Sequence, residues 1–280
     1  MNLDDPGALK RFLAKHDLAP RKGLGQHFLC SSRVVNAIVA ACADCKGILE
    51  IGPGPGVLTG PLSEAAQQLV ALEVDERVPA ALAESAPKAK VVMQDALEAD
   101  LGAILSGLPE PRAVVSNLPY YITGPLITRI AEAAPHYDMA VLMMQKEVAE
   151  RILAKPGNSN RGSLSVYLQF LFDIAKVVDA PGGAFMPPPK VDSLVLKLTP
   201  RRNELGANPA VLFPLVRMAF GQPRKTLRNN LLGDVAIKGH LDELLAEAGI
   251  QATLRPHQLE DSQWLTLANL IDKLKDQRLG

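Results

Sequence analysis

The feature that most constrains this fold is the alternation of short, β-branched apolar runs with longer stretches of helical periodicity. Continuous apolar runs of this length are typical of strands buried on both faces, whereas apolar residues at i, i+3 and i+4 indicate helices. A chain in which the two patterns alternate predicts an α/β fold, with helices packed on both faces of a parallel sheet. The predicted strands are 47–51, 69–75, 90–95, 113–117, 139–145, 174–179 and 193–199, and the predicted helices between them are 32–43, 58–66, 76–86, 125–134 and 146–154.

The pattern changes towards the end of the chain. Only a segment rich in proline and glycine separates the last two predicted strands, so we expect an antiparallel hairpin at the sheet edge. After Thr199 the strand signals stop, 200–209 has the polar composition of a linker, and only helical periods follow, at 211–220, 225–231, 241–248 and 264–274. The sequence therefore predicts two domains, an α/β domain over 1–204 and a small all-helical domain over 205–280.

The bulk composition is that of an ordinary globular protein. Of the 280 residues, 48% are hydrophobic and 21% are charged. No stretch approaches the ~20 apolar residues that a membrane-spanning helix needs. The first residues carry early acids and lack the apolar segment of a signal peptide. We therefore expect a cytoplasmic protein with no membrane partner.

The cysteines predict neither a disulfide framework nor a metal site. Cys30, Cys42 and Cys45 are an odd, low number for a disulfide-rich protein. Cys42 and Cys45 form a single C-x-x-C, but no second Cys or His pair has the spacing that would complete a set of about four zinc ligands. We expect no bound metal and interpret the cysteines as small apolar packing residues.

Charge is unevenly distributed, although the formal net charge is +0. Eight bases stand against two acids between Lys190 and Arg228, and six bases stand against one acid between Lys10 and Arg33. Such segments are either solvated helix faces or a surface that binds phosphates, and charge alone does not separate the two.

Glycines and acids follow the first three predicted strands. The first strand runs into Glu50–Gly56, and glycines between a strand and a helix let a ligand approach the backbone at the carboxyl edge of the sheet. Glu73, at the end of the second strand, is placed to accept ribose hydroxyls, and Asp95, after the third, can bind an adenine amino group. These residues fit an adenosyl or a nicotinamide cofactor, and a structural turn with helix-capping acids would also explain them.

The fourth predicted strand ends in Asn117-Leu118-Pro119-Tyr120 and favours methyl transfer. This tetrapeptide resembles the Asp/Asn/Ser-Pro/Leu-Pro-aromatic motif of amino-methyltransferases, which act on exocyclic nitrogens of bases. The adenine N6 lone pair is delocalised, so the amine needs hydrogen-bond acceptors as it becomes tetrahedral. The Asn117 side-chain oxygen and the Leu118 carbonyl can supply them, Pro119 stiffens the turn, and Tyr120 offers a stacking face. No strong base is needed, because a sulfonium is an excellent leaving group and positioning supplies much of the rate.

Three more segments extend the resemblance over nearly the whole chain. Arg21–Leu29 looks like the R-K-x-x-G-Q-x-F-L signature that opens the KsgA/RsmA family of small-subunit rRNA adenine dimethyltransferases. Phe185–Ser193 is similar to that family's F-x-P-x-P-K-V-x-S segment, and Ala219–Leu231 resembles its A-F-x-Q-R-R-K-T-L motif. Four motifs in the right order identify the chain as a member of this family.

The resemblance implies a fold, a reaction and a set of site residues. It implies a Rossmann-like class I methyltransferase sheet, S-adenosylmethionine (AdoMet) as cofactor, and N6,N6-dimethylation of two adjacent adenosines near the 3′ end of small-subunit rRNA. The partner would be a small ribosomal subunit precursor, and we expect a monomer. The implied cofactor site is His27, Leu29, Gly52, Gly54, Glu73, Val74, Asp95, Ala96 and Asn117. The implied catalytic residues are Asn117, Leu118, Pro119, Tyr120 and Phe185, with the target adenine between the last two rings. The implied RNA contacts are Arg21, Lys22, Arg201, Arg202, Arg224, Lys225 and Arg228.

Two positions depart from the family pattern, and several alternatives stay open. Pro223 replaces the first arginine of the R-R-K run, which removes a phosphate contact and is expected to bend a helix start, and Arg161 stands where the family usually has an aromatic. The alternatives are a large-subunit rRNA adenine methyltransferase of the erythromycin-resistance type and a non-catalytic assembly factor. A DNA adenine methyltransferase is disfavoured because no target-recognition domain is evident, and a nicotinamide oxidoreductase lacks an identifiable hydride-transfer acid or base.

Overall fold

The computed structural model describes residues 3–20, 26–202 and 205–279 and divides into two compact units. The first unit comprises Met1–Ala149 and Asp173–Pro200, and the second comprises Glu150–Phe172 and Arg201–Gly280. The domain boundary expected at 204/205 thus misses one segment of the second unit. Residues 150–172 belong with the C-terminal helices because Val166 and Phe170 share a hydrophobic core with them.

The first unit is built around a seven-stranded sheet in the order β4-β3-β2-β5-β6-β9-β7. Strands β2 to β6 pair in parallel, and β9 runs antiparallel to β6. The last two strands are neighbours, with β7 at the edge, as the segment without a crossover helix predicts. The strands are β2 (Gly47–Ile51), β3 (Gln68–Glu73), β4 (Lys90–Met93), β5 (Arg112–Asn117), β6 (Met139–Gln145), β7 (Phe172–Ala180) and β9 (Ser193–Pro200).

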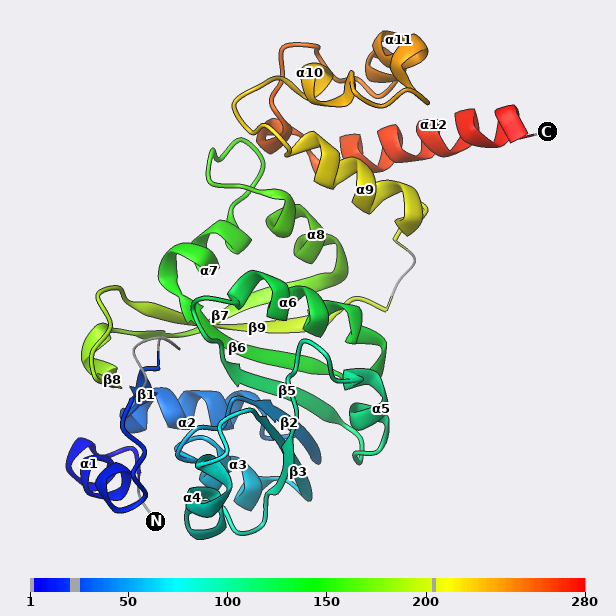
Figure 1. Cartoon of the computed structure of the whole chain (residues 1–280). Coiled ribbons are helices and arrows are strands. Elements are labelled where there is room, and N and C mark those ends of the chain that lie inside the picture. The colour runs from blue at the N-terminus through cyan, green and yellow to red at the C-terminus, as the bar shows by residue number, and fades with distance from the viewer. Residues whose placement is uncertain (1–2, 21–25, 203–204, 280) are drawn as a thin grey trace. The chain divides into compact units, whose positions relative to one another are not determined.

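Helices cover both faces of this sheet, which confirms the α/β prediction. Figure 1 shows α2 (Ser32–Ala41) and α3 (Thr59–Ala65) on one face, and α5 (Leu101–Ser106) and α6 (Thr123–Glu132) on the other. Every residue of β2 is buried, which explains why its sequence is a continuous apolar run interrupted only by Glu50. Helix α4 (Val78–Ser85) packs against α3, and α7 (Lys146–Leu153) follows β6.

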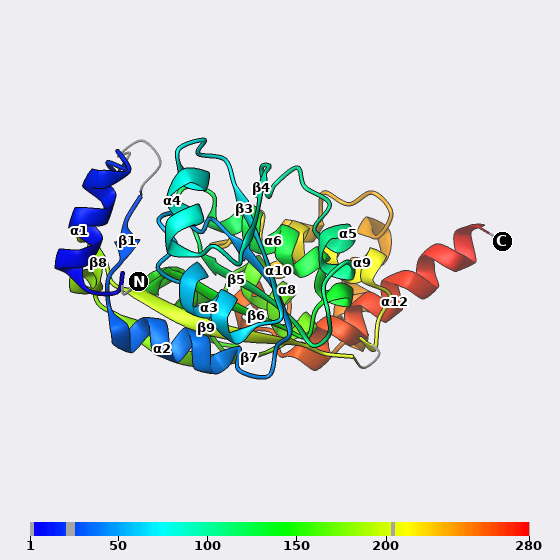
Figure 2. The ribbon, with the colours of Figure 1, turned by 90° about the horizontal axis from the view of Figure 1, so that it is seen from below.

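The N-terminal segment is attached to the first unit through a second, two-stranded sheet. In it β1 (Phe28–Leu29) pairs antiparallel with β8 (Phe185–Met186). Helix α1 (Pro6–Lys15) lies beside this pair (Figure 2) and buries its apolar face in the core of the unit. Short 3₁₀ turns occur at η2 (Ala134–His136), η3 (Gly182–Ala184), η4 (Lys238–His240) and η5 (Pro256–Gln258).

The second unit is helical and packs around Trp264, whose side chain is fully buried. Arg161 belongs to this packing: its Nη1 donates to the Leu259 carbonyl at 2.6 Å and its Nη2 to Asp261 Oδ1 at 2.5 Å. A charged side chain therefore occupies an interior position. The helices are α8 (Ser163–Leu171), α9 (Pro209–Ala219), α10 (Leu227–Leu231), α11 (Leu241–Glu247) and α12 (Asp261–Leu279).

Pro223 does not bend a helix, contrary to the expectation from the sequence. Helix α9 ends at Ala219 and α10 begins only at Leu227, after the N-cap residue Thr226, so Pro223 lies in the loop between them. In the part of the chain that the structure describes, no helix combines the length and apolarity needed to cross a membrane.

Candidate active site

The register of the sheet brings the predicted strand ends to one edge. Ile51 of β2 lies opposite Leu72 of β3 and Ser116 of β5. The next residue along each strand is therefore Gly52, Glu73 or Asn117, and all three reach the carboxyl edge together. Loops at this edge of a parallel sheet are the usual location of a nucleotide site.

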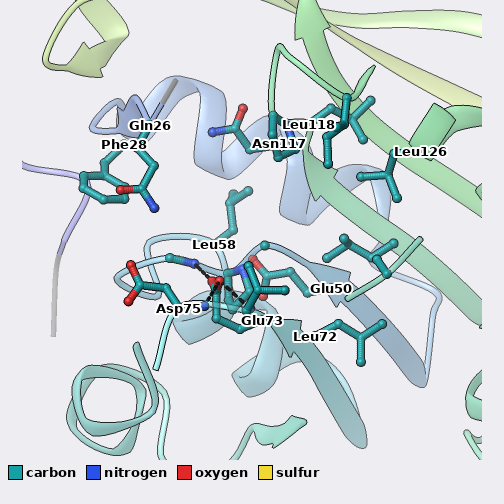
Figure 3. A pocket seen from close by; sticks show the side chains of 18 of the residues that line it. Gln26, Phe28, Glu50, Leu58, Leu72, Glu73, Asp75, Asn117, Leu118 and Leu126 are labelled. Carbon is teal, nitrogen blue, oxygen red and sulfur yellow. Dashed lines mark hydrogen bonds between the residues drawn. The ribbon is translucent and has the colours of Figure 1, made fainter. Parts of the chain in front are cut away.

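A cavity opens at this edge (Figure 3). Asn117 and Leu118 lie on one side of it, and Glu50 and Glu73 lie on the opposite side. The structure thus collects every residue that the sequence analysis assigned to the cofactor, together with the Asn117–Tyr120 turn. The cavity-lining residues among these predictions are His27, Leu29, Gly52, Gly54, Glu73, Val74, Asp95, Ala96, Asn117, Leu118, Pro119 and Tyr120.

Two glycines of the loop after β2 are required for different reasons. Gly52 has φ of 71°, and a Cβ built there would meet nothing within 4 Å. Glycine is required at position 52 because other residues rarely adopt this backbone conformation, and the open space next to Gly52 is part of the cavity. Gly56 has φ of 91°, and a Cβ there would clash with the Ser85 hydroxyl oxygen. Gly56 therefore allows close packing of the loop against α4.

The Glu73 carboxylate organises the loops around it. Its Oε1 accepts from the N–H groups of Val74 at 2.8 Å and Asp75 at 2.9 Å, and its Oε2 accepts from the Gly54 N–H at 3.4 Å. Because an ionised carboxylate offers about four acceptor positions, these bonds leave one for a ligand. Asp95 is exposed, and its Oδ1 accepts from the Leu97 N–H at 2.8 Å, which is the turn-capping role.

Glu50 is a site residue that the sequence analysis did not single out. Its side chain is 2% exposed, and among the described atoms its Oε2 has no hydrogen-bond partner. Burial raises the pKa of Glu50 to about 8, a rise that the nearby Thr59 hydroxyl opposes and the Glu73 carboxylate increases. The available signal was an acid inside an otherwise apolar strand, because such a group is rarely buried without a partner.

The Asn117 turn is held by groups on both sides of it. Asn117 Nδ2 donates to the His27 carbonyl at 3.3 Å, which leaves the side-chain oxygen to accept from another group. The Thr123 hydroxyl donates to the Pro119 carbonyl at 2.9 Å and to the Tyr120 carbonyl at 3.4 Å. The Leu118 N–H donates to the Met143 carbonyl at 2.9 Å, so the turn is fixed to β6.

The Tyr120 ring is held at both ends. Its hydroxyl hydrogen-bonds the fully buried Ser193 hydroxyl at 2.9 Å, and its ring stacks with that of His27 at a centroid distance of 5.7 Å. Burial raises the pKa of the Tyr120 phenol, and the bond to Ser193 opposes that rise. His27 Nδ1 in turn lies 2.7 Å from the Pro187 carbonyl. Tyr121, which the sequence analysis also omitted, lines the cavity and is 58% exposed.

Phe185 is not brought to the cavity. Its side chain is 3% exposed and belongs to the hydrophobic core of the first unit. The pairing of Phe185 with Leu29 in the β1–β8 ladder fixes its position there. The structure therefore corrects the expectation that an adenine lies between the Tyr120 and Phe185 rings.

The structure describes five of the seven predicted RNA-contacting residues. Arg21 and Lys22 lie outside the described residues. Arg201 and Arg202 are exposed at the end of β9, and both take part in interactions within the protein. Arg224 and Lys225 are exposed in the loop before α10. Arg228 pairs with Asp242 through Nε and Oδ1 at 2.6 Å and through Nη2 and Oδ2 at 2.9 Å.

The three cysteines lie in the core of the first unit. Cys30, Cys42 and Cys45 are buried with free thiols, and burial raises the pKa of Cys42 to about 12 and that of Cys45 to about 11. Within residues 3–20, 26–202 and 205–279, no three His, Cys, Asp or Glu side chains are grouped as metal ligands.

The fold and the cavity together define a class of protein. A largely parallel doubly wound sheet, a glycine loop at its carboxyl edge and an Asn-Leu-Pro-Tyr turn beside that loop are the arrangement of a nucleotide-cofactor-dependent methyltransferase. The family model described as ribosomal RNA adenine dimethylase matches residues 18–273. The chain therefore belongs to the ribosomal RNA adenine dimethylase family.

Individual relatives agree with this membership. The chain is 42% identical over 266 residues to ribosomal RNA small subunit methyltransferase A of Nostoc sp., a match that covers 90% of this chain and 98% of the relative. It is 38% identical to the protein of the same name from Geobacillus thermodenitrificans, with 95% and 96% covered.

Two solved structures resemble the chain over most of its length. A dimethyladenosine transferase from Plasmodium falciparum has a TM-score of 0.76 and 26% identity, and the match covers 89% of this chain and 98% of that one. The 23S rRNA methyltransferase ErmE has a TM-score of 0.65 and 28% identity, with 88% and 99% covered. Both neighbours are methyltransferases, in agreement with the class that the site defines.

Proposed function

We propose that this chain is an AdoMet-dependent methyltransferase that converts two adjacent adenosines near the 3′ end of small-subunit rRNA to N6,N6-dimethyladenosine. The observation that carries the proposal is the Asn117–Tyr120 turn, held at the wall of the glycine-loop cavity. The family description supports adenine dimethylation, and the names of the relatives from Nostoc and Geobacillus support the small subunit as the target. The substrate would be a small-subunit precursor in the cytoplasm, and we expect the enzyme to act as a monomer.

The cavity residues fit AdoMet. When bound, AdoMet supplies an electrophilic methyl group on a positively charged sulfur. The Glu50 carboxyl, whose Oε2 has no hydrogen-bond partner among the described atoms, is suited to one of the cofactor's positive charges, because a buried acid gains most from an opposite charge. Glu73 keeps one acceptor position for a ribose hydroxyl, and the open space above Gly52 lets the cofactor approach the backbone. One carboxylate oxygen of Asp95 caps its turn, and the other can accept from the amino group of the cofactor's adenine.

The turn would hold the adenine amine in line with the methyl group. The Asn117 side-chain oxygen and the Leu118 carbonyl would accept hydrogen bonds from the two N–H groups of the amine, while Asn117 Nδ2 keeps its hydrogen bond to the His27 carbonyl. The methyl–sulfur bond would break as the C–N bond forms, with its electron pair left on the sulfur, and the amine nitrogen would lose a proton to solvent. The Tyr120 face that does not contact His27 would stack on the base, a contact worth roughly 1–3 kcal/mol. The base must leave its stack to enter, and the cavity must admit N6-methyladenine because each base is methylated twice.

Asn117→Ala tests the proposal. We expect kcat for methyl incorporation into undermethylated small subunits to fall about 100-fold, the usual cost of removing one preorganised hydrogen-bonding group at a reacting atom. Asn36→Ala is the matched control, since Asn36 is an exposed asparagine on α2. Mass mapping of the methylated adenines identifies the target. Wild-type methylation of the large subunit instead, or an Asn117→Ala enzyme with unchanged kcat, would contradict the proposal.

A further inference from the structure

A single side chain, that of Asn230, holds the loop between α9 and α10. Asn230 Oδ1 accepts from the Gln222 N–H at 2.9 Å, and Nδ2 donates to the carbonyls of Gln222 at 3.1 Å and Thr226 at 3.0 Å. A longer contact, of 3.4 Å, joins Nδ2 to the Lys225 carbonyl. One amide thus binds the backbone near both ends of the segment 221–226, which we call the 221–226 loop.

Backbone hydrogen bonds and the burial of Leu227 also hold the 221–226 loop in place. The Lys225 N–H donates to the Gln222 carbonyl at 2.9 Å and closes a turn. The Leu227 N–H donates to the Leu254 carbonyl at 2.8 Å, and the Leu227 side chain is buried in the core of the second unit. The loop is therefore ordered before any ligand arrives, and a ligand would not have to offset the entropy of ordering it.

This ordered loop presents two adjacent cations to solvent. Residues 221–225 are all exposed and line a groove. Among the described residues, neither Arg224 nor Lys225 forms an ion pair, whereas Arg228, one turn away, is neutralised by Asp242. None of the residues that line the groove is aromatic, and the preceding residue, Phe220, stacks with the buried Trp264 ring. The groove therefore has the chemistry of an anion site and lacks that of a base-stacking site.

We propose that the 221–226 loop is a preformed site for RNA backbone phosphate and that Asn230 is its positioning residue. The inference rests on the proposed function, which supplies RNA as the substrate. The family resemblance assigns RNA contacts to Arg224 and Lys225 but assigns nothing to Asn230. The guanidinium and ammonium groups would bind the phosphate oxygens, while Asn230 fixes the backbone from which both side chains project. Asn230 itself would not touch RNA.

The test is the salt dependence of RNA binding by the full chain. The probe is a transcript of the 3′ region of small-subunit rRNA, and the slope of log Kd against log salt counts the phosphates that are neutralised. Each lost phosphate contact flattens this slope by about 0.7–0.9. We expect the double variant Arg224→Gln/Lys225→Gln to flatten it by about two such steps. We expect Asn230→Ala to flatten it by a similar amount, although this substitution removes no charge.

Two comparisons make the test specific to positioning. Asn229→Ala is the matched control, because Asn229 is the same residue type in the same helix and its side chain makes no hydrogen bond among the described residues. We expect it to keep the wild-type slope. Adding Asn230→Ala to the double variant should cause no further flattening, since the contacts it supports are already lost. Circular dichroism confirms that each variant is folded, and Asn230→Gln, which displaces the amide by one methylene, replaces Asn230→Ala if the latter unfolds.

Two results would overturn the inference, and neither bears on the proposed reaction. A wild-type slope in the folded Asn230 variant, with a flattened slope in the double variant, would show that Asn230 does not position the loop. A wild-type slope in the double variant would show that the loop does not bind phosphate. The proposed reaction is measured separately, as methyl incorporation at saturating RNA, and its loss would appear there in the wild-type enzyme.

Discussion

Replacing Glu50 by glutamine should stabilise the cofactor-free protein and weaken its binding of AdoMet. The two effects have opposite signs because one carboxyl group is responsible for both. It is 2% exposed, and no atom of the described residues hydrogen-bonds its Oε2, so its ionised form is costly until a positive charge enters the cavity. Glutamine has nearly the same shape and no charge, and it therefore removes the cost and the attraction together.

The magnitude follows from the pKa of Glu50, which burial raises from an ordinary 4.5 to about 8. Between these two values the folded protein binds a proton that the unfolded chain does not. The free energy of unfolding therefore falls as pH rises, by about 1.4 kcal/mol per pH unit. This contribution is fully present below pH 4.5 and is lost as the pH passes through 8. Between pH 4.5 and pH 7 the loss amounts to about 3 kcal/mol.

Urea unfolding of the cofactor-free protein from pH 4.5 to pH 8.5 measures the first effect. The stability of Glu50→Gln relative to wild type should increase by about 3 kcal/mol between pH 4.5 and pH 7. Titration calorimetry measures the second effect, and we expect AdoMet affinity to fall about 30-fold at pH 8, the loss of roughly 2 kcal/mol of charge pairing. Glu98→Gln is the control, because Glu98 is an exposed carboxylate.

The two measurements can fail independently. If wild type and Glu50→Gln show the same dependence of unfolding on pH, then Glu50 is ionised in the folded state and burial does not raise its pKa. If AdoMet affinity is unchanged in Glu50→Gln, the carboxylate does not face a positive charge of the cofactor. Wild-type affinity that fails to rise with pH up to about 8 would lead to the same conclusion.

Other substitutions test the positions of individual side chains. Phe185→Ala should lower the free energy of unfolding by about 3–5 kcal/mol in urea, as for a core aromatic, and a loss of turnover at unchanged stability would contradict the buried position. Ser193→Ala should lower kcat about fivefold without changing AdoMet affinity, because it removes the bond of roughly 1 kcal/mol to the Tyr120 hydroxyl. Tyr120→Phe should lower kcat by the same factor as Ser193→Ala, and additive losses in the double variant would show that the two hydroxyls do not act through one hydrogen bond. Arg161→Ala should destabilise the second unit by about 2–3 kcal/mol through loss of its charged hydrogen bonds, including that to Asp261, and unchanged hydrogen exchange in α12 would exclude this.

Much of the fold follows from the sequence because hydrophobic periodicity reports burial directly. The strands at 47–51 and 139–145 have the predicted bounds, since strands covered on both faces must be apolar throughout. Helices α1, α5 and α8 have no counterpart among the predictions. Helix α5 has only six residues, too few to display a period of 3.6, and α8 is apolar on most of its surface. The assignment of 150–172 to the second unit depends on packing between segments distant in sequence, which periodicity does not report.

The cavity residues were predictable for a different reason. Gly52, Glu73, Asp95 and Asn117 lie at or just after the ends of strands of the main sheet. Parallel strands in register bring such residues to the same edge, so position along the chain predicts position in space. His27 and Leu29 lie at β1 instead, and only the family resemblance indicated them. The buried position of Phe185 was not predictable in this way, because motif order says nothing about the direction of a side chain in a two-residue strand. The exposure of Tyr121 depends on the path of the turn, and the pairing of Arg228 with Asp242 joins two helices, so neither could be read from strand order.

His27 connects motifs that are far apart in the sequence to the Asn117–Tyr120 turn. Its carbonyl accepts the Asn117 amide, its ring stacks on Tyr120, and its Nδ1 lies 2.7 Å from the Pro187 carbonyl. The β1–β8 ladder fixes the backbone on both sides of that last contact. The orientation of the Asn117 oxygen therefore depends on the N-terminal segment as much as on β5. An asparagine suits this position better than an aspartate, because only the amide can donate to the His27 carbonyl while its oxygen accepts from an amine.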